Sequence, residues 1–267
     1  MARGQSPDRP GHWRRLRWLR RLTVGLLAVF IVPLLGSMAS VFGHSYDWRT
    51  ASMDSTGIAP DPATNRSAIV QVYSARAFGW RAAVGVHTWI AVKPTDAPRF
   101  TVYEVFGWQV MRGLPAVRQS QRDPDGMWYG NAPEILFDMR GPGVDDVIAR
   151  VEQAVASYPY GDSYTVWPGP NSNTFTAWVA REVPELKVDL PPTAIGKDYL
   201  PNGALFKETP SGTGWQFSLF GLAGIMVAAD EGLEINLLGL VFGIDITQPA
   251  LKLPGLGRLD ILANDGT

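Results

Sequence analysis

The sequence predicts an α+β protein in which a transmembrane helix precedes an antiparallel sheet with packed helices. Three observations predict this class. Residues 22–43 carry no charge, short runs rich in β-branched and aromatic residues begin at Ser67, and an amphipathic helical pattern follows Gly143. The 267 residues are 46% hydrophobic and 11% aromatic. Such a chain is too apolar to be disordered and long enough for one large domain or two small ones.

Residues 1–21 contain seven arginines and one aspartate, and the uncharged run follows directly. As a helix this run would be about 33 Å long, enough to cross a hydrocarbon core of about 30 Å. Arginine-rich flanks stay on the cytoplasmic side of a membrane. We therefore expect a cytoplasmic Arg-rich tail over 1–21, a transmembrane helix over 22–43 and export of all that follows. This predicts a single-pass protein of the cell inner membrane, with the lipid bilayer as a partner and a periplasmic C-terminal domain.

A cleaved signal peptide is the alternative, because Ser37-Met38-Ala39 is a passable small-x-small cleavage site. The uncharged run is longer than an ordinary signal core, which favours the anchor. Residues 44–66 are polar and lack apolar periodicity, so they predict a linker. An exported globular domain is expected over 67–267.

The elements of this domain follow from local patterns. The β-rich runs 84–92 and 100–108 flank a turn-rich loop, which predicts a hairpin. Apolar residues from Val144 to Val155 recur on one helical face. In chain order we expect a strand over 69–73, the hairpin strands, a short helical turn over 133–139, a helix from Val144 that Pro159 ends, and a helix from near Asn173 that Pro184 closes.

The tail contains two apolar runs, 217–229 and 233–244, around Asp230-Glu231-Gly232. Each is too short for an ordinary spanning helix, and four glycines disfavour helices there. They predict a hairpin over 217–244 with both faces apolar, so that it is buried or lies against something. The simpler interpretation is that this hairpin completes the domain's own sheet. The more specific interpretation is that it contacts the bilayer.

Candidate catalytic residues are His87, Ser172 and Glu104. His87 is the one histidine of the predicted domain, so histidine-dependent catalysis there must use it. Hairpin pairing places it opposite roughly Glu104 or Val105, where a carboxylate could orient an imidazole. Ser172 opens a helix after a Pro/Gly loop, where backbone N–H groups can stabilise an oxyanion. We expect the three to converge in one cleft near the membrane-proximal surface.

Each candidate also has a structural interpretation. His87 could be a hydrogen-bonded strand residue, Glu104 could face solvent, and Ser172 or Asn173 could be a helix N-cap. Asn171, Asn173 and Lys197 are candidate ligand-binding residues. For Lys197 the alternative is a surface ion pair with Asp198.

Composition excludes several other classes. The chain has no cysteine, which rules out disulfides, a thiolate nucleophile and cysteine-ligated metals. The formal net charge of −1 argues against a globally basic protein that binds nucleic acid. Two of the three histidines precede the domain, and neither a P-loop nor a dinucleotide fingerprint occurs. We therefore expect no metal and no cofactor, and the sequence names no protein partner.

Six short motifs stand out between about residues 67 and 260: Gly79-Trp80-Arg81, His87-Thr88-Trp89, Trp128 to Pro133, Trp167 to Phe175, Pro191 to Tyr199 and Pro210 to Gln216. Together they resemble the bacterial family named domain of unknown function 3750. That family name implies no activity, so this resemblance bears on membership alone.

A more distant resemblance concerns chain order. A strand histidine, a polar residue on the next strand and a nucleophile that opens a helix are similar to circularly permuted papain-like proteins, such as lecithin retinol acyltransferases and related amidases. Their nucleophile motif reads Asn-Cys-Glu-His-Phe, and this chain has Asn171-Ser172-Asn173-Thr174-Phe175. The resemblance implies a permuted papain-like fold. Serine in place of cysteine removes thiol catalysis and implies a Ser–His variant or a non-catalytic binder.

Two functions therefore stay open. One is a binding or cell-envelope module without chemistry. The other is a Ser/His-dependent hydrolase or acyltransferase that acts on lipid or peptide-like acyl bonds beside the membrane.

Overall fold

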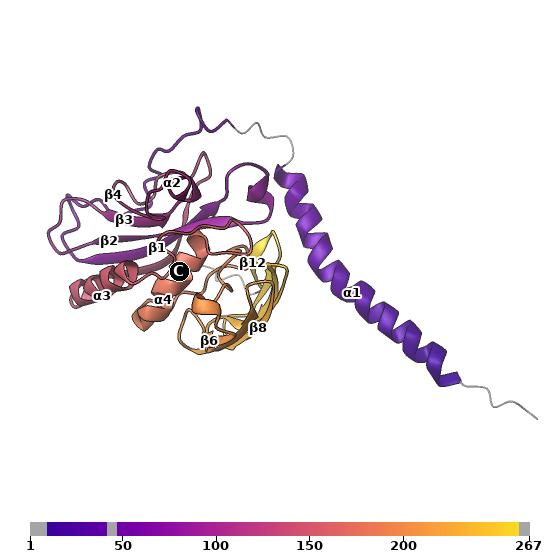
Figure 1. The fold of residues 1–267 in the computed structure, drawn as a ribbon. Helices are drawn as coiled ribbons and strands as arrows, with labels where there is room; N and C mark the ends of the chain where they lie inside the picture. Colours follow the sequence, from indigo (N-terminus) through magenta and orange to yellow (C-terminus); the bar gives the residue numbers. More distant parts are fainter. Residues whose placement is uncertain (1–9, 42–46, 262–267) are drawn as a thin grey trace, which may run out of the picture.

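The computed structural model describes residues 10–41 and 47–261 (Figure 1). The first part of the Arg-rich tail, the junction between the predicted membrane helix and linker, and the end of the predicted domain lie outside the described residues. Within the described ranges the chain forms one long helix and an α+β domain with two antiparallel sheets. The predicted α+β class with an N-terminal apolar helix is therefore confirmed, although the prediction had one sheet.

Helix α1 (Pro10–Val41) begins earlier than the uncharged run, so the arginines from Arg14 to Arg21 lie on its first turns. Pro33 lies inside the helix. Among the described residues, α1 is the helix that is long and apolar enough to cross a membrane, over Trp13–Val41. A signal sequence would satisfy the same criterion of length and composition. In Figure 1 the N-terminal part of the helix runs away from the domain, which the helix contacts along its C-terminal half, from Phe30 onward.

The first sheet has the strand order β4-β3-β2-β1-β5. Its strands are β1 (Ile69–Arg76), β2 (Val86–Lys93), β3 (Thr101–Val105), β4 (Val117–Gln121) and β5 (Glu134–Arg140). The predicted hairpin is confirmed, because β2 and β3 pair with Ala91 opposite Val102. The predicted helical turn over 133–139 is wrong, because this segment is β5. Pairing along β1 satisfies its backbone groups, and this tertiary contact outweighs the local pattern.

Helices α3 (Val144–Ala156) and α4 (Ser172–Glu182) cover one face of this sheet, as Figure 1 shows. Both were predicted. Val72 and Ile90 of the sheet are fully buried against Val151 and Phe175 of the helices. The other face carries a second cluster, rich in aromatic side chains, around Trp89 and including Tyr73, Phe106 and Trp128. The first sheet is thus packed on both faces.

The second sheet is a seven-stranded meander in the order β12-β11-β10-β9-β8-β7-β6. Its strands are β6 (Phe206–Glu208), β7 (Gly214–Leu219), β8 (Ala223–Ala228), β9 (Gly232–Leu237), β10 (Leu240–Asp245), β11 (Ala250–Leu253) and β12 (Gly257–Asp260). Helix α4 lies between the two sheets, and Arg181 near its end donates hydrogen bonds to Gln216 of β7 and to the carbonyl of Glu208.

The predicted hairpin over 217–244 is correct in strand character and wrong in strand number. Each apolar run folds back on itself, at Phe220-Gly221 and at Leu238-Gly239, so the segment spans four strands instead of two. All four turn residues have positive φ, as the tight turns of twisted hairpins require. Phenylalanine and leucine rarely adopt this conformation, so the apolar pattern concealed the turns.

The predicted linker is irregular in its described part, residues 47–66, but it lies against the domain. Asp125 is almost completely buried, and its carboxylate accepts hydrogen bonds from the Ser55 hydroxyl and from the backbone N–H groups of Ile58 and Ala59. Burial alone would raise the pKa of Asp125, but these hydrogen bonds outweigh it and hold the pKa below its ordinary value. The linker is thus attached to the rim of the first sheet.

Candidate ligand-binding site

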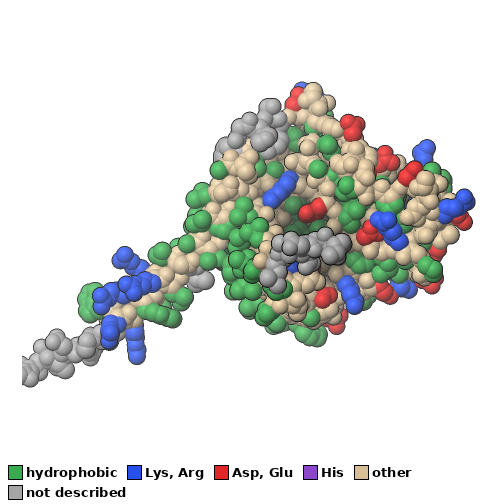
Figure 2. Space-filling model, turned by 180° about the vertical axis from the view of Figure 1, so that it is seen from behind, with side chains coloured by type: hydrophobic (Ala, Val, Ile, Leu, Met, Phe, Trp, Pro, Cys, Tyr) green, Lys and Arg blue, Asp and Glu red, His purple; other side chains and the backbone are tan. Residues whose placement is uncertain are grey.

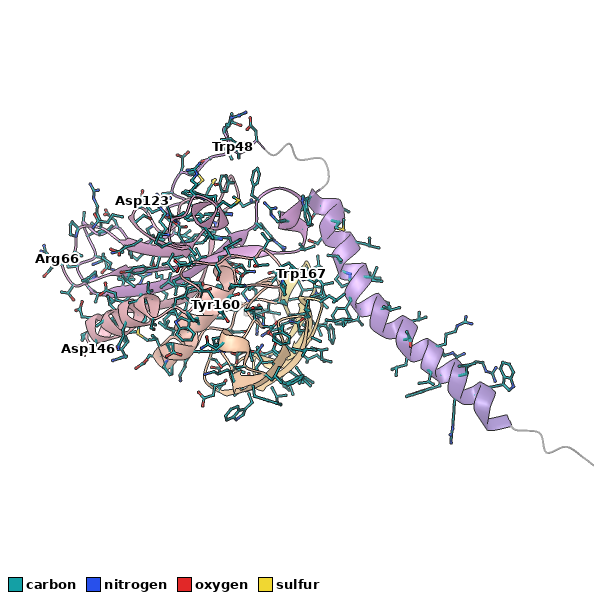
Figure 3. The ribbon with its side chains drawn as sticks, viewed as in Figure 1. Trp48, Arg66, Asp123, Asp146, Tyr160 and Trp167 are labelled. Carbon is teal, nitrogen blue, oxygen red and sulfur yellow. The ribbon has the colours of Figure 1, made fainter. Side chains whose placement is uncertain are left out.

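A cavity of about 700 Å³ lies where strand β2 begins. Its walls come from segments far apart in the sequence: the linker, the short helix η1 (Gly79–Ala83), the start of β2, the one-turn helix α2 (Gly107–Val110) and the N-terminus of α4. Five of the lining residues are tryptophans: Trp48, Trp80, Trp108, Trp128 and Trp167. Figure 3 labels two of them, Trp48 on the linker and Trp167 in the loop before α4. The cavity is therefore mainly apolar and aromatic.

The loop before α4 is held by an asparagine. The side-chain oxygen of Asn171 accepts hydrogen bonds from the backbone N–H groups of Asn173 and Thr174, and the Thr174 hydroxyl accepts one from the N–H of Asn171. This reciprocal pair is a capping box. The prediction that Ser172 or Asn173 is the N-cap is therefore wrong, because Asn171 occupies that position and Ser172 is the first helical residue.

The strand alternation of β2 decides which side chain faces α4. The Thr88 hydroxyl lies 3.0 Å from the side-chain oxygen of Asn173 and 2.9 Å from the hydroxyl of Thr176. Neighbouring residues on a strand point to opposite faces. Thr88 thus lies against the helix, and His87 points to the aromatic face.

His87 is buried in the aromatic cluster. Its ring stacks on Trp128 with 3.7 Å between ring centroids. Its Nε2 lies 3.8 Å from Glu104 Oε2, too far for a hydrogen bond, and has no hydrogen-bond partner among the described residues. Burial lowers the pKa of His87 although Glu104 opposes the shift. His87 is therefore a neutral aromatic wall of the cavity at pH 7.

Glu104 is buried beside His87. Burial alone would raise its pKa, but neighbouring groups, among them the positively charged Arg122, outweigh that effect and hold the pKa below its ordinary value. Arg122 Nη2 is 3.2 Å from Glu104 Oε2. The predicted register, with Glu104 or Val105 opposite His87, is off by one or two residues, since extending the β2–β3 pairing puts Phe106 opposite His87. Glu104 approaches His87 diagonally, from the same face of the next strand.

Ser172 also lines the cavity and is buried. Its backbone carbonyl accepts a hydrogen bond from Thr176 of α4. Its hydroxyl forms no hydrogen bond with His87 or with any other residue that the structure describes. The structure thus brings His87 and Glu104 together and places Ser172 on the same cavity without linking it to the imidazole.

The three predicted ligand-binding residues have internal partners. Asn171 donates to the carbonyls of Val166 and Ile195, and Asn173 donates to the carbonyls of Val86 and Ile195. Both nevertheless border the cavity.

Lys197 does not reach this cavity, and the expected surface ion pair with Asp198 is wrong. Lys197 is almost completely buried and pairs with Glu234 of β9, with Asp198 at 3.7 Å. Burial alone would lower its pKa, but these two carboxylates outweigh burial and raise the pKa. The partner Glu234 lies far along the sequence, so no local pattern indicated the burial.

Sequence reasoning did not assign the tryptophans and Arg81 to a site, although the motifs that carry the family resemblance contain Trp80, Arg81, Trp128 and Trp167. Trp80 is 71% exposed at the rim, beside Arg81. The available signal was the ten tryptophans of the chain, several of which stand next to Gly or Pro in the sequence. Within residues 10–41 and 47–261, no group of three or more His, Asp or Glu side chains is placed to hold a metal ion.

Comparison with known proteins agrees with the family resemblance. Residues 67–199 match the family described as Protein of unknown function (DUF3750), and this region of the chain belongs to that family. The matched region contains the first sheet, α3, α4 and most of the cavity, and it ends before the second sheet. No curated protein and no solved structure matches the chain.

Proposed function

We propose that this DUF3750 family member is an inner-membrane-anchored, periplasm-facing binding protein. Its ligand would be an amphiphile with an apolar chain and an anionic head group. The observation that carries the proposal is the tryptophan-lined cavity of about 700 Å³. Small-molecule sites in proteins are concave, mostly apolar and equipped with a few polar groups, and their volumes fall in this range.

The charge of the lining suggests the head group. Arg81 is the one formally charged side chain among the described lining residues, because buried His87 is neutral. Arg81 is exposed at the rim, where its guanidinium could pair with a carboxylate or phosphate. The apolar chain would lie deeper, against Trp128 and Phe106.

The position of the cavity relative to α1 suggests where the ligand comes from. The Ser37 hydroxyl of α1 donates to the carbonyl of Ala83 in η1, the same short helix that carries Trp80 and Arg81 to the rim. If α1 crosses the membrane with its arginines in the cytoplasm, the rim lies near the outer surface of that membrane. An amphiphile could then pass from the bilayer into the cavity.

Photolabelling tests this function. The full chain in detergent would be irradiated with a palmitic acid that carries a diazirine in its chain, with unlabelled palmitate as competitor. We expect competable labelling of peptides that contain Trp128 or Trp167. Ala77→Phe, which fills the cavity, should abolish most of it, and Ala63→Phe on the linker surface should not.

A second arm tests the head group. Arg81→Gln should weaken labelling by the fatty acid and leave labelling by the matching fatty alcohol unchanged, with Arg99→Gln as the surface control. Labelling that is not competed, or that Ala77→Phe leaves intact, would contradict the proposal.

The hydrolase or acyltransferase interpretation remains the second candidate, because Ser172 lines the same cavity and its hydroxyl forms no hydrogen bond with the part of the chain that the structure describes. Serine catalysis requires an adjacent base, so a ligand would have to bring Ser172 and His87 into contact on a permuted papain-like scaffold. A fluorophosphonate probe tests this directly. Labelling that disappears in Ser172→Ala and in His87→Ala would favour catalysis, and absence of labelling in the wild type would favour binding alone.

A further inference from the structure

The second sheet buries polar side chains and exposes apolar ones, the reverse of the arrangement expected for a protein surrounded by water. Its outward side chains are apolar and exposed: Trp215 is 65% and Val227 57% exposed. Strand β9 alternates strictly, with Leu233, Ile235 and Leu237 outward and Glu234 and Asn236 buried. In strands β7 to β11 no charged residue occupies an outward position. We call this surface the apolar sheet face.

The apolar sheet face is continuous across the strands. Pairing puts Phe217, Ile225, Ile235 and Phe242 in one row. The next row begins with Trp215 opposite Val227. Soluble monomers rarely expose apolar patches of this extent, and larger ones mark an interaction surface.

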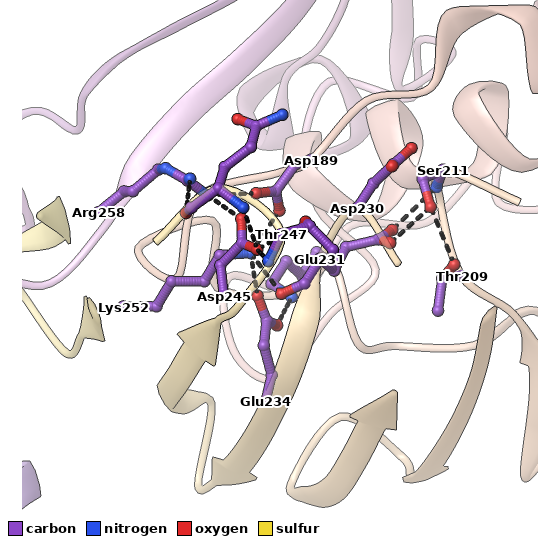
Figure 4. A network of polar contacts seen from close by, with 12 residues as sticks. Asp189, Thr209, Ser211, Asp230, Glu231, Glu234, Asp245, Thr247, Lys252 and Arg258 are labelled. Atoms are coloured by element: carbon purple, nitrogen blue, oxygen red, sulfur yellow. Dashed lines mark hydrogen bonds and ion pairs between the residues drawn. The ribbon is translucent and has the colours of Figure 1, made fainter. Parts of the chain in front are cut away.

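The inward face holds the sheet in this orientation. Figure 4 shows Glu234, Lys252, Asp189, Arg258 and Asp245 joined by hydrogen bonds and ion pairs beneath the strands. Breaking a buried ion pair by turning one partner outward would leave an unpaired buried charge, which is strongly destabilising. The sheet therefore cannot rotate to hide its apolar side chains, and something outside the domain must cover them.

Helix α1 indicates what covers them. Phe30 of α1 packs on Phe242 of β10, with 6.4 Å between ring centroids, and the Ser37 hydroxyl lies 2.9 Å from the carbonyl oxygen of Gly255 beside β12. From Phe30 to Val41 the helix rises about 16 Å, which is close to half of a hydrocarbon core of about 30 Å. The sheet thus lies alongside the C-terminal half of the one described helix that could cross a membrane.

The space-filling view agrees with this arrangement. Figure 2 shows hydrophobic side chains gathered on the side of the domain next to the helix and continuing along it, whereas the helix arginines lie at its far end. A bilayer that surrounds α1 would therefore also contact the adjoining sheet.

We infer that the apolar sheet face is a bilayer-docking surface that inserts into the acyl-chain region of the leaflet on the domain's side of the membrane. The hydrocarbon covers the outward rows, and the buried ion pairs remain shielded beneath the strands. The strand backbone is fully paired in the middle of the sheet, so insertion exposes few unsatisfied polar groups to lipid. The inference is independent of the ligand proposed for the cavity.

Docking of the sheet would also place the rim of the cavity next to the membrane. The indole N–H of Trp167 donates to the carbonyl of Leu238, in the turn between β9 and β10. Leu238 is exposed and belongs to the same apolar surface. The rim of the cavity and the docking surface therefore share an edge.

The absence of cysteine allows a site-specific test. Val227→Cys and Ile235→Cys on the apolar sheet face, and Asp146→Cys on α3 at the opposite end of the domain, would each carry an environment-sensitive NBD fluorophore (Figure 3 labels Asp146). The full chain would be reconstituted in vesicles of phosphatidylcholine and phosphatidylglycerol containing nitroxide-labelled acyl chains. We expect blue-shifted emission and loss of most of the intensity by nitroxide quenching at Val227→Cys and Ile235→Cys, and neither effect at Asp146→Cys.

Two outcomes would overturn the inference. If aqueous iodide quenches the fluorophores at Val227→Cys and Ile235→Cys and the lipid nitroxides do not, the surface faces water. If neither quencher reaches them and a bifunctional thiol reagent yields dimers of the unlabelled Val227→Cys chain, a second copy covers the sheet. Neither outcome depends on photolabelling of the cavity, so failure of this inference is distinguishable from failure of the proposed binding function.

Discussion

Asn171 and Ser172 are neighbours with different roles. Asn171 caps α4 and also joins the loop to the carbonyls of Val166 and Ile195, whereas the Ser172 hydroxyl has no hydrogen-bond partner in the described chain. Ser172, which the sequence suggested as a nucleophile, therefore contributes little to the stability of this loop. Asn171, the residue before it, stabilises the loop and the start of α4.

We predict that Asn171→Ala lowers the free energy of unfolding by about 0.5–2 kcal/mol, because the capping interaction is lost. Ser172→Ala should leave stability nearly unchanged, because an unpartnered hydroxyl contributes little. Denaturant unfolding of the full chain in detergent measures both. Equal losses in the two variants would show that the serine hydroxyl has a structural partner after all.

His87 should make stability depend on pH. Burial holds its pKa below 6.5, so below that pH the unfolded chain binds a proton that the folded chain does not. Its contribution to stability is complete above pH 6.5 and is lost as the pH falls towards the folded pKa, at up to about 1.4 kcal/mol per pH unit. Lowering the pH from 7.5 to 5.5 should therefore reduce the free energy of unfolding of the wild type more than that of His87→Phe. Parallel pH profiles for the two proteins would refute a neutral, buried imidazole.

At the scale of elements, each sheet depends on contacts that the local sequence pattern of its strands does not indicate. Strand β5 forms because β1 offers an unpaired edge, and the four tail strands form because Phe220 and Leu238 accept positive φ in tight turns. Strand β9 exposes leucine and isoleucine because Glu234 must meet Lys197 and Lys252 beneath the sheet. Pairing partners, more than intrinsic propensity, decide these elements.

Glu234 should be the most sensitive residue of the second sheet. Glu234→Ala leaves two buried lysines short of a counter-charge, so we expect a loss of about 3–5 kcal/mol in the free energy of unfolding. Glu208→Ala, at the exposed edge strand, should change stability by less than about 0.5 kcal/mol. Thermal unfolding of both variants in detergent checks this, and a small effect of Glu234→Ala would mean that water reaches the lysines.

At the scale of the whole molecule, α1 links the arginine-rich segment to the domain. The arginines mark one end of the helix, and the domain meets the other end. We predict that α1 crosses the inner membrane with its N-terminus in the cytoplasm. Alkaline phosphatase fused after Thr267 should then be active, because that enzyme needs export, and a fusion after Arg21 should be inactive. The reverse pattern of activity would place the domain in the cytoplasm.

Local pattern was sufficient for features that one stretch of chain determines. The uncharged run, the β2–β3 hairpin, α3 and the approximate start of α4 could be predicted because charge, alternation and helical period act over a few neighbouring residues. The proximity of His87 and Glu104 was also predictable, since one hairpin carries both.

Only the tertiary structure decided which faces meet. The alternation of β2 is visible in the sequence. That Thr88 faces α4 and His87 faces the aromatic cluster depends on which side of the sheet the helix packs against. The burial of Lys197 and the tryptophan cavity join residues from segments far apart in the chain. Sequence by itself thus determined the membrane-length helix, the β2–β3 hairpin and the two long helices of the domain. The cavity and the apolar sheet face were decided by packing and charge pairing between residues far apart in the sequence, which no short stretch of the chain contains.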